Sequence, residues 1–142
     1  MKIIVGSDHG GFKLKRAVVE DLKEKGLDVT DFGPETADSV DYPDYAKPVA
    51  EKVASGEYDK GILICGTGIG MSISANKVKG IRSALVHDTF SARATRQHND
   101  SNVLAMGERV IGEGLALDIV DIWLNTEFEG GRHERRVCKI EE

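Results

Sequence analysis

The feature that most constrains the fold of this chain is a regular alternation of short strand-like runs with longer amphipathic stretches. Five runs are apolar or alternate between apolar and polar residues, as β-strands do, at residues 2–5, 27–32, 61–65, 81–87 and 102–106. Stretches with helical character follow them, at residues 12–25, 44–55, 70–78, 88–98 and 112–124. Such an alternation builds βαβ units. The sequence therefore predicts an α/β fold, a single-domain doubly wound (Rossmann-like) five-stranded parallel sheet with helices on both faces.

Length and composition narrow the class of protein. With 142 residues and neither an internal repeat nor a linker, the chain is expected to form one domain over 1–142. Its net charge of -5 disfavours a nucleic-acid partner, and no apolar run approaches the ~20 residues of a membrane span. We therefore expect a cytoplasmic protein in which Cys65 and Cys138 stay reduced. No CxxC pair or His/Cys cluster stands at metal-ligand spacing, so no metal site is predicted.

A glycine segment, "CGTGIG" at residues 65–70, follows the third apolar run. Its glycines allow backbone N–H groups to approach an anion at the start of the next helix. The segment lacks the Lys of a Walker loop, and its GxGxG spacing departs from a dinucleotide fingerprint. Asp88, about twenty residues on, is only a weak indication of a nicotinamide-dependent reductase. A tight strand-to-helix turn with no ligand remains the plainer interpretation.

Cys65 stands at the end of a predicted strand, where ligands bind in doubly wound folds. Free cysteines are often buried as core residues, which is one interpretation. A helix N-terminus stabilises a thiolate, however, and a thiolate there can act as a nucleophile or as a base. Cys138 lies in the charged tail and has no comparable environment.

Three further groups of polar residues are candidates for binding. Asp8 and His9 follow the first predicted strand, and a second histidine close to an aspartate, His98, stands in "RQHND" at 96–100. Arg132 and Arg136 are four apart and share one face if the tail is helical. Two guanidinium groups on one face suit a phosphate, although from the residues alone a solvated basic helix end is the slightly better explanation.

Five separated segments together carry a resemblance to a known family: "SDHGGFKLK", "DYPDYA", "GILICGTGIGMSISANK", "RQHNDSNVLAMGERVIG" and "GGRHERR". In this order they resemble the type B ribose-5-phosphate isomerase family, which also includes the galactose-6-phosphate isomerase subunits. The resemblance implies a cofactor-free and metal-free aldose–ketose isomerase that interconverts ribose 5-phosphate and ribulose 5-phosphate. The alternatives are an isomerase of a hexose 6-phosphate, such as allose or galactose 6-phosphate, and a phosphosugar-binding module without catalysis.

The resemblance also implies roles for individual residues. Cys65 would be the base that moves a proton between C1 and C2, and Thr67 and His98 would assist opening of the furanose ring. Hydroxyl groups of the sugar would be held by Asp8 and Asn99. The enediolate would be stabilised by the amides of the glycine segment, Gly66, Thr67, Gly68, Ile69 and Gly70. The phosphate would be surrounded by His9, Arg109, Arg132 and Arg136.

The last predicted helix, 112–124, is apolar on more than one face, which is more than contact with one sheet requires. The family resemblance implies a homodimer, possibly a tetramer. In that arrangement residues 126–142 form a C-terminal arm that reaches the cysteine loop of the partner subunit.

Overall fold

The computed structural model describes all residues, 1–142, in five strands and six α-helices. The strands are β1 (Lys2–Ser7), β2 (Asp28–Gly33), β3 (Lys60–Cys65), β4 (Ser83–Leu85) and β5 (Val103–Gly107). The helices are α1 (Phe12–Glu24), α2 (Pro43–Ala54), α3 (Ile69–Ala75), α4 (Thr89–Ala94), α5 (Glu113–Asn125) and α6 (Arg132–Ile140). Two short turns complete the list, η1 (His9–Gly11) and η2 (Thr95–Asn99). Every predicted strand and helix is present, with boundaries that differ by a few residues.

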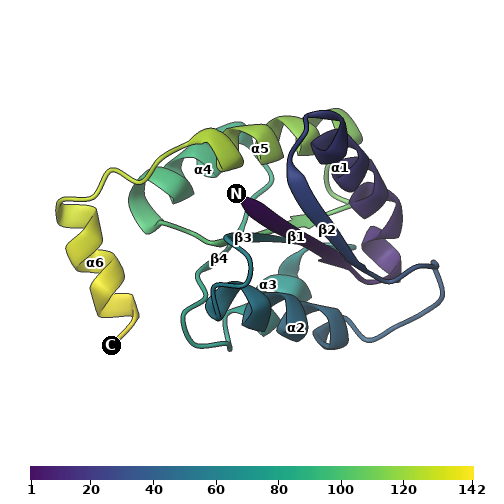
Figure 1. The fold of residues 1–142 in the computed structure, drawn as a ribbon, viewed down its shortest axis with the longest axis horizontal. Helices are drawn as coiled ribbons and strands as arrows, with labels where there is room; N and C mark the ends of the chain where they lie inside the picture. Colours follow the sequence, from purple (N-terminus) through teal and green to yellow (C-terminus); the bar gives the residue numbers. More distant parts are fainter.

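All strand pairs are parallel, and the strands lie in the order β2-β1-β3-β5-β4. Helices α1, α4 and α5 cover one face of this sheet, and α2 and α3 cover the other (Figure 1). The predicted doubly wound α/β fold is confirmed. The chain passes from β1 outward to β2 and then returns to the opposite side of β1 at β3. The carboxyl ends of β1 and β3 therefore flank the point at which the strand order reverses, where such folds bind ligands.

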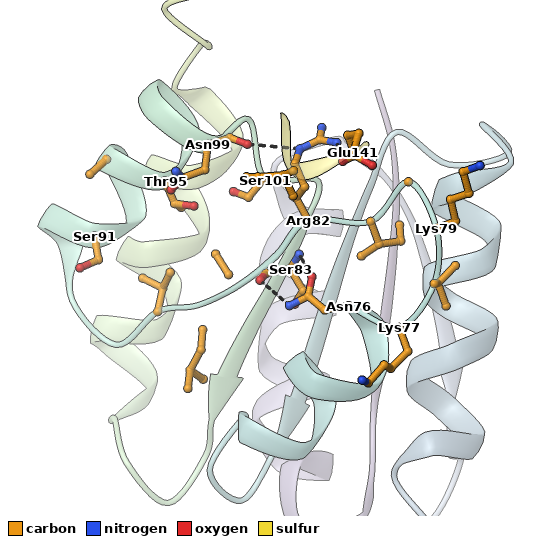
Figure 2. A pocket seen from close by; sticks show the side chains of 18 of the residues that line it. Asn76, Lys77, Lys79, Arg82, Ser83, Ser91, Thr95, Asn99, Ser101 and Glu141 are labelled. Carbon is orange, nitrogen blue, oxygen red and sulfur yellow. Dashed lines mark hydrogen bonds and ion pairs between the residues drawn. The ribbon is translucent and has the colours of Figure 1, made fainter. Parts of the chain in front are cut away.

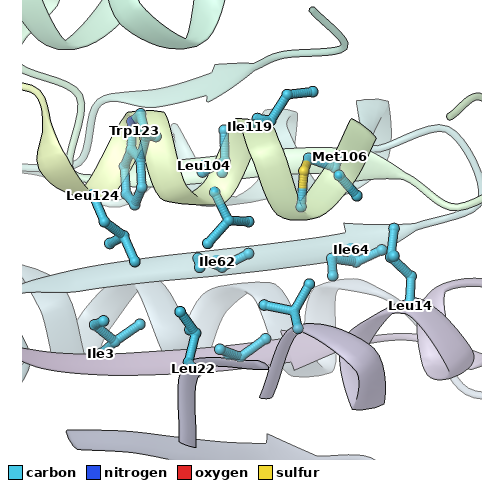
Figure 3. Close-up of a cluster of buried hydrophobic side chains, with 14 of the residues drawn as sticks. Ile3, Leu14, Leu22, Ile62, Ile64, Leu104, Met106, Ile119, Trp123 and Leu124 are labelled. Atoms are coloured by element: carbon cyan, nitrogen blue, oxygen red, sulfur yellow. The ribbon is translucent and has the colours of Figure 1, made fainter. Parts of the chain in front are cut away.

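Two hydrophobic cores hold the helices on the sheet. Figure 3 shows the larger one, in which Ile62 and Leu104 of the central strands pack beneath Ile119 and Trp123 of α5. The second core lies on the other face, where the alternate residues of the same strands contact α2 and α3. Strands buried on both faces read as continuous apolar runs, which explains why the third run was recognisable in the sequence.

The predicted helix 88–98 is interrupted. Helix α4 ends at Ala94 and the chain continues as the wider π-helical turn η2, after which Asp100 takes a left-handed conformation with φ 47°. The buried Arg96 side chain donates to the Ser101 carbonyl at 2.7 Å and to the Thr126 carbonyl at 3.2 Å. These contacts hold the turn against the end of α5, and they replace the last turn of the predicted helix.

The predicted strand 81–87 pairs only over β4, which is the edge of the sheet. The side chain of Asn76 accepts from the Ser83 N–H at 2.8 Å and donates to the Ser83 carbonyl at 3.0 Å (Figure 2). An amide side chain thus occupies the outer hydrogen-bonding groups of Ser83, the first residue of the edge strand.

Helix α6 stands apart from the two layers, on the side where β1 begins (Figure 1). The arm, residues 126–142, is tied to η2 by the Glu129 N–H, which donates to the Gln97 carbonyl at 3.1 Å. Near its end, Glu141 pairs with Arg82 at 2.6 Å. No helix of the chain is both long and apolar enough to cross a membrane.

Candidate active site

The loops that follow β1 and β3 meet in the crevice at the reversal of strand order. The Asp8 N–H donates to the Ile64 carbonyl at 3.2 Å, and the Asp8 carboxylate accepts from the Gly11 N–H at 3.1 Å. A Cβ atom on Gly10 would lie only 3.1 Å from the Gly66 nitrogen. The glycines therefore allow the Asp8 turn to lie directly against the cysteine loop. This agrees with the predicted positions of Asp8 and Cys65 at strand ends.

Cys65 is the last residue of β3 and is nearly buried, with 5% of its surface exposed. Its Sγ accepts a hydrogen bond from the Gly68 N–H at 3.0 Å. Gly68 has φ 77°, and a Cβ atom there would lie 2.7 Å from the Met106 backbone and from Leu85, so only glycine fits. The Gly68 amide thus fixes the position of the sulfur within the loop.

The amides of the glycine segment provide the second half of this site. The Ile69 N–H donates to the Thr67 hydroxyl at 3.2 Å. The N–H groups of Gly66, Thr67 and Gly70 donate to no group of the chain. Free amides beside a buried sulfur are the arrangement that stabilises negative charge as it develops on a substrate oxygen.

A second layer of contacts, which the sequence analysis missed, supports the loop from β5. The Gly107 N–H donates to His87 Nε2 at 2.9 Å, and a Cβ atom on Gly107 would lie within 2.8 Å of the Thr67 backbone. The next residue, Glu108, donates its N–H to the Cys65 carbonyl at 2.9 Å. Burial lowers the pKa of His87, which keeps Nε2 free to accept. No local motif marks His87, because its role depends on a contact between two strands.

Three side chains form the rim of the crevice. His9 is exposed, and its Nδ1 accepts from the Val40 N–H at 3.2 Å. The Arg109 side chain lies against Gly66, whose added Cβ would meet it at 3.4 Å. Tyr42 covers Gly70 from the other side, where an added Cβ would meet its ring at 2.6 Å. Tyr42 was not among the predicted site residues, although the "DYPDYA" segment contains it.

The remaining predicted residues do not join this crevice within one chain. His98 and Asn99 lie in η2, which leads into the amino end of β5, whereas Cys65 lies at the carboxyl end of β3. Arg132 and Arg136 are exposed on α6, which is attached to η2. A cavity of about 890 Å³ borders the outer edge of β4, and Asn99 and Glu141 are among its lining residues (Figure 2). The parallel sheet therefore separates the predicted site residues into two groups, one at each end of its strands.

Comparison with known proteins shows the family of the chain. The sequence profile of the Ribose/Galactose Isomerase family matches residues 3–140. The chain belongs to that family. Ribose-5-phosphate isomerase B of Escherichia coli is 54% identical over 139 residues, which cover 98% of this chain and 93% of that protein.

Solved structures support this membership in the ribose/galactose isomerase family. Ribose-5-phosphate isomerase B of Clostridium thermocellum has a TM-score of 0.98 at 60% identity, covering 99% of this chain and 95% of that one. The Mycoplasma genitalium enzyme, solved with bound ribulose-5-phosphate, has a TM-score of 0.96 at 46% identity, with coverages of 99% and 93%. The predicted family is confirmed, whereas the individual roles of the site residues stay predictions.

Proposed function

We propose that the chain is a cofactor-free cytoplasmic aldose–ketose isomerase that interconverts ribose 5-phosphate and ribulose 5-phosphate. The observation that carries this proposal is the buried Cys65 sulfur, which accepts from Gly68 beside amides that have no partner in the chain. Family membership and the names of the relatives support the same substrate pair. A non-catalytic phosphosugar-binding module would not require a thiolate at this position.

The proposed chemistry is a proton transfer between neighbouring carbons. The Cys65 thiolate removes the proton from C2 of the open-chain aldose, and the electron pair forms the C1–C2 double bond of an enediolate. Negative charge then moves to the carbonyl oxygen, where the free amides of Gly66, Thr67 and Gly70 stabilise it. The thiol returns its proton to C1, and a hydroxyl proton moves from O2 to O1, so the thiolate is regenerated. Each of these steps conserves atoms and charge.

The substrate must open its ring before C2 can react, and the residues proposed for this step are Thr67 and His98. Thr67 lies in the cysteine loop, but His98 lies at the amino end of β5. We infer that a second copy of the chain supplies His98, together with Asn99, to each crevice. The exposed Arg132 and Arg136 of the same arm would bind the phosphate. The proposed assembly is thus a homodimer, possibly extended to a tetramer, with the arm of each subunit at the partner's cysteine loop.

The function is tested by turnover of a panel of pentose and hexose phosphates by the purified chain. The expected result is the highest kcat/KM for ribose 5-phosphate, without added metal or nucleotide. A higher kcat/KM for allose or galactose 6-phosphate would identify a hexose phosphate isomerase instead. Binding without any turnover across the panel would contradict catalysis and favour a binding module.

A further inference from the structure

A second cluster of reactive side chains lies where the arm meets η2, away from the cysteine crevice of the same chain. The potential ligand atoms of His98, Glu129 and His133 all lie within 4.8 Å of one another. Glu129 Oε1 is 3.5 Å from His133 Nε2 and 3.8 Å from His98 Nε2. The two imidazole rings stack with their centroids 4.4 Å apart. Residues that are far apart in the sequence therefore bring two imidazoles and one carboxylate within reach of one another.

The backbone fixes this convergence. Glu129 is held to η2 by its N–H, which donates to the Gln97 carbonyl next to His98. His133 lies in the first turn of α6, and its N–H donates to the Gly130 carbonyl at 3.1 Å. The His133 side chain is only 12% exposed, whereas the His98 side chain is 46% exposed and has room to rotate. None of the three side chains makes a hydrogen bond within the chain, so their donors and acceptors remain available.

We propose that His98, Glu129 and His133 form a binding site for a divalent transition-metal ion, with Zn²⁺ as the best-matched ion. Two imidazole nitrogens and one carboxylate oxygen are a frequent protein donor set for zinc, with a fourth position left for water. Bonds of ~2.0–2.1 Å in a tetrahedron separate neighbouring ligand atoms by about 3.3 Å. The observed 3.5 Å and 3.8 Å are close to that separation, and rotation of the exposed His98 ring brings its nitrogen toward the ion.

Glu129 supplies the negative charge of this cluster, whereas Arg132 and Arg136 of α6 place positive charge near it. A neutral imidazole is the form that binds a metal. The carboxylate of Glu129 would offset part of the charge of the ion. Zn²⁺ at this point would also join the arm to η2, because its ligands come from both segments.

Occupation of this site has a consequence that rests on the proposed function. A His98 nitrogen bound to Zn²⁺ cannot exchange a proton with the ring oxygen of a sugar. The ion would therefore act as a reversible inhibitor rather than as a cofactor, and chelation would restore activity. Metal binding itself does not depend on the identity of the substrate, so binding and inhibition can be measured separately.

The site is tested by titrating the purified whole chain with Co²⁺, a spectroscopic substitute for Zn²⁺, and then displacing the Co²⁺ with Zn²⁺. We expect one Co²⁺ per chain with the visible d–d absorption of a tetrahedral site and without a thiolate-to-cobalt charge-transfer band. H133A and E129Q should each weaken binding by about tenfold or more, as loss of a ligand should cost at least what loss of an outer-shell partner does. Unchanged affinity in both variants would overturn the proposal.

Cysteine is the competing explanation, since thiolates bind Zn²⁺ strongly. The matched controls are C65A and C138A, which should bind Co²⁺ with the affinity of the unmodified chain. Loss of binding in either control, or a charge-transfer band, would assign the metal to a thiolate and reject the site. Circular dichroism melting without metal should give H133A and E129Q nearly unchanged Tm values, which excludes misfolding as the cause of lost binding. If the chain shows no isomerase activity, these binding measurements still decide the proposal.

Discussion

The cysteine crevice and the arm are held to the protein in different ways. In the crevice, backbone contacts dominate, as in the close approach of Gly10 to Gly66 and of Gly107 to Thr67. The arm is attached by one backbone hydrogen bond to Gln97 and by side-chain contacts such as the pair between Arg82 and Glu141. Rigid backbone is suited to a step that needs precise placement of a base and an anion hole. An exposed arm is suited to reaching another molecule.

The largest expected effect is the difference between substituting Cys65 in the crevice and substituting Cys138 on the arm. C65A should lower kcat by ~10²–10⁴-fold, the usual contribution of a positioned base, with a much smaller change in KM. C138A, on the arm, is the matched control and should retain the activity of the unmodified chain because its side chain is exposed on α6. Steady-state kinetics with ribose 5-phosphate measure both. Activity of C65A above a few per cent of the unmodified chain would show that Cys65 is not the base.

The second prediction asks whether the two regions act together across subunits. C65A and R136A chains are unfolded, mixed and refolded, and activity is measured well below the KM of R136A, where each parent retains only a small fraction of the unmodified activity. In a two-fold dimer each mixed pair has one intact site and one doubly damaged site, so activity should recover to about a quarter of the unmodified level. If mixed dimers form and activity does not recover, then the cysteine and the arginine belong to one subunit.

A smaller effect is expected from the phosphate contacts of the arm. R136A should raise KM for ribose 5-phosphate by roughly 10–100-fold, since a hydrogen bond to a charged group contributes about 1.5–3 kcal/mol. Turnover of unphosphorylated ribose, where measurable, should change little. R135A is the matched control, because Arg135 is exposed on the same helix but one position removed from the predicted face. Equal effects of R135A and R136A would indicate a general charge effect instead of a phosphate site.

The smallest expected effect tests the support of the crevice through His87. Its folded-state pKa lies below the ordinary value, so the contribution of its hydrogen bond to stability is complete above about pH 6.5 and is lost as the pH falls from there toward the folded-state pKa. H87Q keeps an acceptor but does not titrate. Between about pH 7.5 and pH 5.5 the unmodified chain should lose up to about 1 kcal/mol more stability than H87Q.

Thermal melting at several pH values measures this difference. H87A, which has no acceptor, should be the less stable variant at every pH because the Gly107 N–H loses its partner. Identical pH profiles for the unmodified chain and H87Q would show that the pKa of His87 is the same in the folded and unfolded states.

The fold could be predicted because its signals are local. Gly26 and Gly56, placed after the first two helical stretches, both have left-handed conformations at φ 77° and 84°. The interruption of the fourth helix was not predictable in this way, since it depends on contacts of Arg96 with the distant Thr126. Periodicity reports which face of an element is buried, but it does not report a side chain that reaches across to another element.

The separation of the site residues into two groups could nevertheless be predicted in part from their order in the sequence. Cys65 follows a predicted strand and His98 precedes one, and in a parallel sheet these positions lie at opposite edges. The roles of His87 and Tyr42 could not be predicted, because each contacts a glycine that is distant in sequence, Gly107 and Gly70 respectively. Such pairs become visible only when the strand order is known.

The contact of Asn76 with the edge strand also limits how copies of the chain can associate. A bare edge strand offers its amides and carbonyls to any other extended chain, and this is a common route to fibrils and to sheets that continue from one molecule into the next. Ser83 is the first residue of the edge strand β4, and its outer N–H and carbonyl are already bound by the side chain of Asn76. Growth of the sheet into a ribbon of many copies is therefore opposed at Ser83, whereas association through the helices and the arm is not affected by this contact.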